Sequence, residues 1–246
     1  MVAQSLARPY RVPIAMVVLV SLVPLYIFIP ALWPPPTRYV PEIALDRAFP
    51  LIPAWAIVYG ALYVFLILLP ILVVRQEELI RRTVYAYLLI WITAYLFFFV
   101  FYPTAAPRPE KVIGEGFAVW GLSILYSSDP PYNCFPSLHV AHSFVSALAS
   151  YRVHRGLGIV ALICATLVAL STLFTKQHYI LDVLAGVLLA LIAYAIFLRK
   201  ESQVPAFDRD VAPALALCIG MLVTIGIAGY WIAYVWIGET RFEFGP

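Results

Sequence analysis

The sequence predicts an all-α protein, a polytopic bundle of about seven helices that cross a membrane. Of its 246 residues, 63% are hydrophobic and 12% are charged, and the mean hydropathy is +0.92. A soluble domain could not cover its surface with so few polar side chains. The charged residues also gather between long stretches that contain none. Both observations are typical of helical membrane proteins.

Seven uncharged stretches mark the expected spans. A membrane-spanning helix needs about 20 residues, and each stretch is long enough or nearly so. They are Val12–Thr37, Ala48–Val74, Thr83–Pro107, Pro130–Tyr151, Gly156–Thr175, Val183–Leu198 and Val211–Gly238. The sixth reaches this length only if it includes His178 and Asp182. Arg8 and Arg11 precede the first stretch as in a signal peptide. We interpret that stretch as a retained span, because it shows no clear cleavage site of small residues.

These spans indicate one integral membrane domain over residues 1–246, with a core at about 83–198. The spans at 12–37 and 48–74 precede the core, and the span at 211–238 follows it. The sequence contains no long repeat or low-complexity linker that would separate a second domain.

The basic residues predict the orientation of the bundle, since short cytoplasmic loops carry an excess of Lys and Arg. With the N-terminus in the cytoplasm, 10 of the 16 basic residues lie on the inner side and 6 on the outer side. This topology brings Arg108, His139, His178 and Asp182 to the extracytoplasmic face, although they are far apart in the sequence.

His178 and Asp182 are the most informative residues, four positions apart at the expected start of the sixth span. On a helix, this spacing puts both side chains on one face. The carboxylate can then hold the imidazole in one tautomer and stabilise positive charge on the ring. Because ionisable residues inside a membrane are costly and usually functional, we interpret His178 as a nucleophile that Asp182 orients. The alternative is a structural pair that ties helices together.

Two other segments add polar residues to the same face. Ser137 follows a proline and is a suitable N-cap, which places His139 in the first turn of a helix. Free N–H groups at such a helix start favour anions, and His139 can protonate a leaving oxygen. Arg108 offers a planar fork of donors to two phosphate oxygens, and Lys176 adds a point charge. Taken alone, Arg108 could equally lie among lipid headgroups, and His139 could simply close the helix end.

These segments resemble the three signature motifs of the type 2 phosphatidic acid phosphatase superfamily of membrane lipid phosphatases and phosphotransferases. The matching residues are Arg108-Pro109 for the end of the first motif, Pro136-Ser-Leu-His139 for the second, and Ser171 through His178 to Asp182 for the third. The resemblance covers about Thr83 to Leu198 and implies a six-helix phosphatase-like core.

The chain departs from the usual motifs at three positions. Phe101 stands at the usual lysine, Leu138 at the glycine of the second motif, and Thr172 at the arginine of the third. Two phosphate-binding cations are therefore missing, and we expect Lys176 to replace one of them. The motifs are closer to the branch that contains the aureobasidin-sensitive inositol phosphorylceramide synthases, which transfer a phosphoryl-headgroup between lipids.

The resemblance implies a two-step reaction that needs no metal and no cofactor. His178 attacks the lipid phosphorus to form a phosphohistidine, while His139 protonates the departing oxygen. Water or the hydroxyl of a second lipid then attacks, with His139 as the base. Arg108, Lys176 and Ser137 would hold the non-bridging oxygens as charge builds. Hydrolysis and transfer share the first step, so both remain open.

A transporter or lipid scramblase with His139, His178 and Asp182 as a proton relay is the alternative. Paired interrupted helices in two related halves would support it, and the sequence shows no such symmetry. A purely structural subunit would leave the shared face of polar residues unexplained. The net charge of +3 is too small to indicate nucleic acid, and the three cysteines show no metal-ligand spacing. We therefore expect a membrane lipid phosphate as substrate, with a second lipid as acceptor if the group is transferred.

Overall fold

The computed structural model describes residues 14–32, 38–129, 131–200 and 203–237. Within these ranges the regular structure is helical, apart from two isolated bridges that join Tyr39 to Thr104 and Thr104 to Asn133. The predicted all-α class is therefore confirmed. Arg8, Arg11 and the ends of the first and last expected spans lie outside the described residues.

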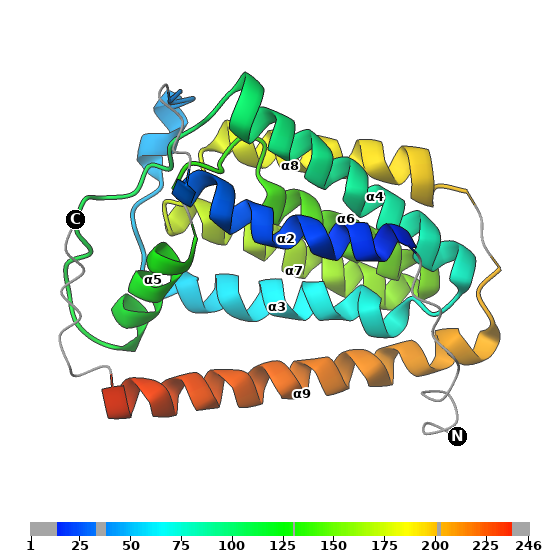
Figure 1. Ribbon diagram of the computed structural model, residues 1–246. Coiled ribbons are helices and arrows are strands. Elements are labelled where there is room, and N and C mark those ends of the chain that lie inside the picture. Colours follow the sequence, from blue (N-terminus) through cyan, green and yellow to red (C-terminus); the bar gives the residue numbers. More distant parts are fainter. Residues whose placement is uncertain (1–13, 33–37, 130, 201–202, 238–246) are drawn as a thin grey trace.

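Eight α-helices are found in the described part of the chain (Figure 1). They are α2 (Ile14–Leu32), α3 (Trp55–Val73), α4 (Glu77–Leu96), α5 (Phe117–Ser128), α6 (Leu138–Val153), α7 (Arg155–Phe174), α8 (Ile180–Ala193) and α9 (Ala206–Ile237). A π-helical segment continues α4 over Phe97–Phe101 and another continues α8 over Tyr194–Leu198. A short 3₁₀ turn, Ala44–Ala48, lies between α2 and α3.

Five of these helices are long and apolar enough to cross a membrane, counting α4 and α8 with their π-helical segments. They are α3, α4, α7, α8 and α9. α2 has a shorter apolar part, Val17–Tyr26, and α6 has only 16 residues. The chain is therefore a multi-pass membrane protein.

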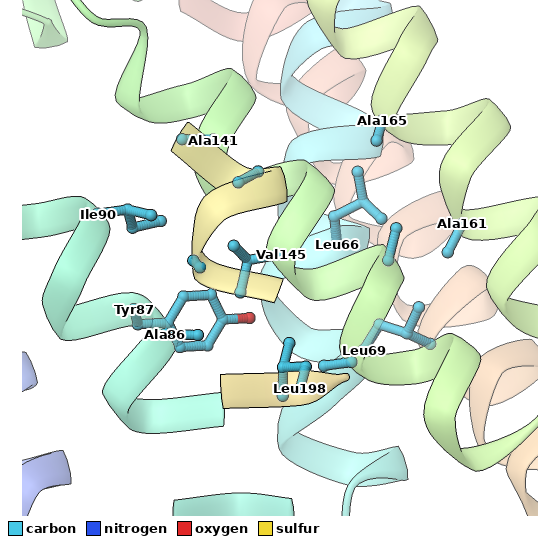
Figure 2. Packing of buried hydrophobic residues seen from close by; sticks show 14 of the residues in the cluster. Leu66, Leu69, Ala86, Tyr87, Ile90, Ala141, Val145, Ala161, Ala165 and Leu198 are labelled. Atoms are coloured by element: carbon cyan, nitrogen blue, oxygen red, sulfur yellow. The ribbon is translucent and has the colours of Figure 1, made fainter. Parts of the chain in front are cut away.

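Helix α6 lies at the centre of the bundle and packs against α3, α4, α7 and α8. In a membrane, helices associate mainly through close packing of small residues and through hydrogen bonds between helices. Both are present here, because Ala141, Ala161 and Ala165 are fully buried and the Tyr87 hydroxyl lies 2.8 Å from Ser146 Oγ. Figure 2 shows how these small residues and larger ones such as Leu66 converge between the helices.

Helices α3, α6 and α8 all begin at one end of the bundle, which we call the site end (left in Figure 1). Three loops are tied together there by backbone hydrogen bonds. Tyr39 N–H donates to the Pro103 carbonyl at 2.8 Å, and Ala106 N–H donates to that of Pro131 at 2.7 Å. The Tyr39 ring also stacks on Tyr102, with centroids 4.2 Å apart. The loops thereby form a connected platform around the starts of α6 and α8.

Candidate active site

Ser137 caps α6 as the sequence predicts. Its hydroxyl accepts a hydrogen bond from Val140 N–H at 3.4 Å, and its side chain is fully buried. His139 consequently lies in the first turn of α6. Because the Ser137 hydroxyl is engaged at the cap, it contributes to the site by holding the start of α6 in place.

The chain reverses sharply between α7 and α8, and this turn positions His178. Lys176 has a φ of 54°, the left-handed conformation that commonly ends a helix. Its N–H donates to the Leu173 carbonyl at 3.2 Å, and Gln177 N–H donates to that of Thr172 at 2.9 Å. These two bonds are those of a Schellman motif. They satisfy carbonyls at the end of α7 and return the chain to the site.

His178 and Asp182 are close together, although not as two residues of one helix. α8 begins at Ile180, so His178 precedes it, and Asp182 lies in the first helical turn. Asp182 reaches back, accepting a hydrogen bond from Tyr179 N–H at 2.9 Å. Its Oδ2 lies 3.5 Å from His178 Nδ1, close enough for an ion pair when the imidazole is protonated, although the two atoms form no hydrogen bond.

The two histidines are brought together by a close contact between α6 and α8. Their ring centroids lie 5.9 Å apart. Ser137 N–H donates to the Asp182 carbonyl at 3.0 Å, which joins the two helix starts. A Cβ at Gly186 would lie 2.6 Å from the Ser137 carbonyl oxygen, far inside normal contact distance. Only glycine fits there, and its absent side chain lets the helices approach.

Arg108 bonds Gln177, the residue before His178, and other protein groups hold most of its guanidinium. Nη1 donates to the carbonyls of Asp129 at 2.8 Å and Tyr126 at 3.1 Å, and Nη2 donates to Gln177 Oε1. Asp129 Oδ2 also lies 3.5 Å from Nη2. Nε is buried and has no partner. Arg108 therefore has the Nε–H free for a ligand, whereas the sequence suggested that the whole guanidinium would be available.

A cavity of about 230 Å³ reaches His178 from the site end. Lys176 lines it, and its Nζ donates to the Asp46 carbonyl at 3.4 Å. The carboxylates of Glu42 and Asp46 and the side chain of Arg47 also line it. The cavity thus combines positive and negative groups at the approach to the predicted nucleophile.

Asp46 is a structural anchor that sequence reasoning missed. It is buried, and its two carboxylate oxygens accept hydrogen bonds from Ile180 N–H at 2.8 Å and Ile43 N–H at 2.7 Å. A carboxylate at a helix N-terminus is favourable because it satisfies a free N–H and opposes the positive end of the helix dipole. Asp46 thereby fixes the start of α8, next to His178.

Three tyrosines surround His139, and no pattern in the sequence indicates them. The rings of Tyr26, Tyr59 and Tyr63 lie 5.9, 5.4 and 5.0 Å from the imidazole, all edge-on. The Tyr26 hydroxyl donates to Asp129 Oδ1 at 2.8 Å. Asp129 therefore joins α2 to Arg108, and the tyrosine rings pack around a His139 side chain that is half-buried.

Unpartnered buried polar atoms are concentrated in this region. Among the described residues, eleven buried side-chain nitrogen or oxygen atoms have no hydrogen-bond partner. Six of them belong to residues of the site, namely Arg108 Nε, Asn133 Oδ1, His139 Nδ1, Gln177 Nε2, His178 Nδ1 and Asp182 Oδ1. Buried polar groups are normally paired, because leaving one unpaired costs about 1–3 kcal/mol. The excess at this site is typical of a place where a polar ligand or water binds.

The fold also brings together three residues that could hold a metal ion. The ligand atoms of Cys134, His178 and Asp182 all lie within 4.8 Å of one another. Burial raises the pKa of the Cys134 thiol well above its usual value, and the nearby Asp182 and Asp129 raise it further. The thiol is therefore neutral at neutral pH, which makes it a weak ligand, since metals bind the thiolate.

Fold and site together define a multi-pass helical membrane protein with two histidines, an aspartate and an arginine gathered at one end. Residues 40–196, more than half of the chain, match the PAP2 superfamily. The chain therefore belongs to this superfamily, which confirms the resemblance at that level.

The chain is also similar to a PA-phosphatase related-family protein of Dictyostelium discoideum. The two are 32% identical over 110 residues, which is 39% of this chain and 20% of that relative. The similar region is thus one fifth of the relative's length. No solved structure matches the chain. These comparisons support a phosphatase-related membrane protein.

Proposed function

We propose that the protein is a membrane enzyme that cleaves or transfers the phosphoryl group, or phosphoryl-headgroup, of a lipid through a phosphohistidine at His178. The convergence of His139 on His178, with ring centroids 5.9 Å apart, carries the proposal. Two histidines this close can both reach one phosphoryl group, one at the phosphorus and the other at the leaving oxygen. Asp182 Oδ2, 3.5 Å from His178 Nδ1, is the group that would orient the nucleophile.

The geometry suggests a distinct role for each histidine. His178 Nδ1 faces Asp182, so Nε2 is left to attack the phosphorus. As the N–P bond forms, the P–O bond to the leaving group breaks, and His139 gives its proton to the departing oxygen. Asp182 stabilises the positive charge that the His178 ring acquires. The tyrosine rings around the half-buried His139 shield it from part of the solvent, which strengthens these electrostatic interactions.

Four groups would hold the non-bridging oxygens during the transfer. Arg108 Nε is unpaired and beside the site, and Gln177 Nε2 is a second unpaired buried donor. Lys176 brings a positive charge from the cavity wall. Ser137 contributes through the start of α6, where free N–H groups favour an anion.

In the second step, water or the hydroxyl of another lipid attacks the phosphohistidine, and His139 takes its proton. Both steps proceed in this proposal without a metal ion. The distribution of basic residues supports a site on the extracytoplasmic face, which a lipid of the outer leaflet would enter.

The test is an assay of purified protein in detergent with labelled lipids, with His178→Ala as the blank. The panel contains phosphatidic acid, a polyprenyl diphosphate, and phosphatidylinositol with either ceramide or diacylglycerol as acceptor. Phosphate release that the blank lacks would identify a phosphatase, and a new phospholipid without phosphate release would identify a transferase. Equal activity of the blank would refute the assignment of His178.

Vanadate separates the enzyme from a transporter or scramblase. It can occupy a phosphoryl-transfer site in place of phosphate, so it should inhibit turnover in competition with the lipid. Lipid movement that is insensitive to vanadate and needs no turnover would instead favour the scramblase.

A further inference from the structure

A second, larger cavity lies between α3, α5 and α9 at the site end. Its volume is about 560 Å³, within the range of about 300–1,000 Å³ that is usual for ligand sites. None of the described residues that line it is charged, and its few polar groups include Tyr59, Ser128 and Tyr230. The cavity is therefore suited to an apolar ligand.

Three glycines keep this cavity open, one from each of its helices. A Cβ added to Gly60 of α3, Gly121 of α5 or Gly226 of α9 would meet no heavy atom within 4 Å. Glycine weakens a helix relative to alanine, and none of these positions needs glycine for close packing. Their shared feature is the empty space that they border.

The depth of the cavity matches one leaflet of a membrane. Its lining on α3 runs from Ala56 to Leu68, which is about 18 Å of helix at about 1.5 Å per residue. The hydrocarbon core of a bilayer is about 30 Å thick, so the cavity extends from the site end through slightly more than half of it. A single extended hydrocarbon chain has this shape.

The cavity shares a wall with the candidate active site. Tyr59 lines the cavity, and its ring lies 5.4 Å from that of His139. Ser128 also lines it and directly precedes Asp129, which contacts Arg108. A chain lying in the cavity would therefore begin next to the residues that are proposed to act on the phosphate.

Aromatic contacts between α5 and α9 close the cavity at the site end. The Phe117 ring lies 4.9 Å from Trp231, and the Trp120 ring lies 4.8 Å from Tyr230. Figure 1 shows α5 lying across the end of the bundle between α3 and the C-terminal part of α9. Since α9 begins at Ala206, after the matched residues 40–196, a segment beyond the family match builds one wall.

We infer that this cavity holds one hydrocarbon chain of the lipid whose phosphate reacts at His178. The inference rests on the proposed function and extends it, because it names the part of the lipid that the protein selects. The bound chain positions the phosphate between His139 and His178, so chain length and shape become determinants of specificity.

The first test fills the cavity with Gly226→Leu and uses Gly229→Leu on the same helix as the matched control. Both positions have open space around them, but only Gly226 lines the cavity. We expect Gly226→Leu to lower kcat/KM for a long-chain lipid phosphate at least about tenfold, because misplaced substrates react slowly. A short-chain, water-soluble analogue should react equally with both variants and the unchanged protein. Equal long-chain activity of both variants would overturn the inference and leave the proposed function intact.

A binding test without turnover separates the cavity from the chemistry. Purified His178→Ala protein is irradiated with a lipid phosphate that carries a photoreactive group in its chain, and the labelled residues are mapped by mass spectrometry. The inference requires labelling of α5 and the C-terminal half of α9 that excess long-chain lipid phosphate suppresses and the short-chain analogue does not. If labelling is instead spread over all lipid-facing helices and the competitor does not affect it, bulk lipid fills the cavity. That result would overturn the inference. If this labelling holds but the active protein turns over no lipid phosphate, only the proposed chemistry fails.

Discussion

Replacing Gly186 with alanine tests whether the contact between α6 and α8 sets the geometry of the site. The added Cβ would lie 2.6 Å from the Ser137 carbonyl oxygen, whereas ordinary contacts begin at 3.4 Å. The helices must therefore separate locally by about 0.8 Å, the difference between 3.4 and 2.6 Å. The hydrogen bond from Ser137 N–H to the Asp182 carbonyl joins the same segments. Moving α6 and α8 apart should therefore change the distance between His139 and His178.

Both activity and stability should change in Gly186→Ala. A misplacement of about 1 Å can lower a rate by about 10²-fold, so we expect a loss in kcat/KM of about tenfold to hundredfold. Overpacking costs about 1–3 kcal/mol, and alanine strengthens a helix over glycine by about 0.5–1 kcal/mol. The net loss of stability should be about 0–2.5 kcal/mol.

The measurements are lipid turnover and thermal unfolding in the same detergent, with Gly229→Ala as the matched control. An added Cβ at Gly229 meets nothing within 4 Å, so this variant should keep full activity and gain up to about 1 kcal/mol from helix propensity. Wild-type turnover in Gly186→Ala would refute the reasoning, because it would show that the catalytic geometry tolerates the separation of α6 and α8.

Three further predictions concern the surroundings of His178. Lys176→Asn should lower kcat/KM by about tenfold to hundredfold, since a hydrogen bond to a charged group contributes about 1.5–3 kcal/mol. Asparagine tolerates the left-handed backbone at φ 54°, so the Tm of Lys176→Asn should stay unchanged. Lys176→Arg should keep most of the activity. A lower Tm of Lys176→Asn that accompanies its loss of activity would point to a structural role. Asp46→Asn should lower the stability in thermal unfolding by about 1–2 kcal/mol, because it weakens the cap of α8. Its control, Glu42→Gln, alters an exposed ion pair and should change the stability by less than about 0.5 kcal/mol. Finally, EDTA should leave turnover unchanged, because the proposed mechanism uses no metal ion and the neutral Cys134 thiol makes the cluster of Cys134, His178 and Asp182 a weak metal site. Activity lost to EDTA would contradict the metal-free mechanism.

The sequence was sufficient for the fold class and for the closeness of His178 and Asp182. Span lengths follow from membrane thickness, and a separation of four residues at a helix start keeps two side chains near each other whether or not both are helical. The cap at Ser137 was also predictable, because a serine after proline ahead of an apolar run has a local physical meaning.

The supporting contacts could not be predicted, because they join segments far apart in the chain. Asp46 bonds Ile180 across 134 positions, and Tyr26 bonds Asp129 across 103. Neither aspartate belongs to a motif, and an isolated acidic residue in a loop is usually solvated. Lys176 gave no signal of its left-handed backbone either, since glycine is the residue that normally marks such a turn.

The balance of charges at the site bears on which lipids the proposed enzyme would take. Phe101 replaces a usual family cation and is 60% exposed, and Thr172, which replaces another, is fully buried and bonds within its own helix. Arg108 is held by Asp129, Lys176 lies against the backbone of Asp46, and Arg47 is paired with Glu42. A phosphate monoester carries about −1.5 to −2 charges at pH 7, whereas a phosphodiester carries one. With so little net positive charge, the site matches the single charge of a phosphodiester better than the larger charge of a monoester, so the lipid panel should show faster turnover of phosphatidylinositol than of phosphatidic acid if the proposed function holds.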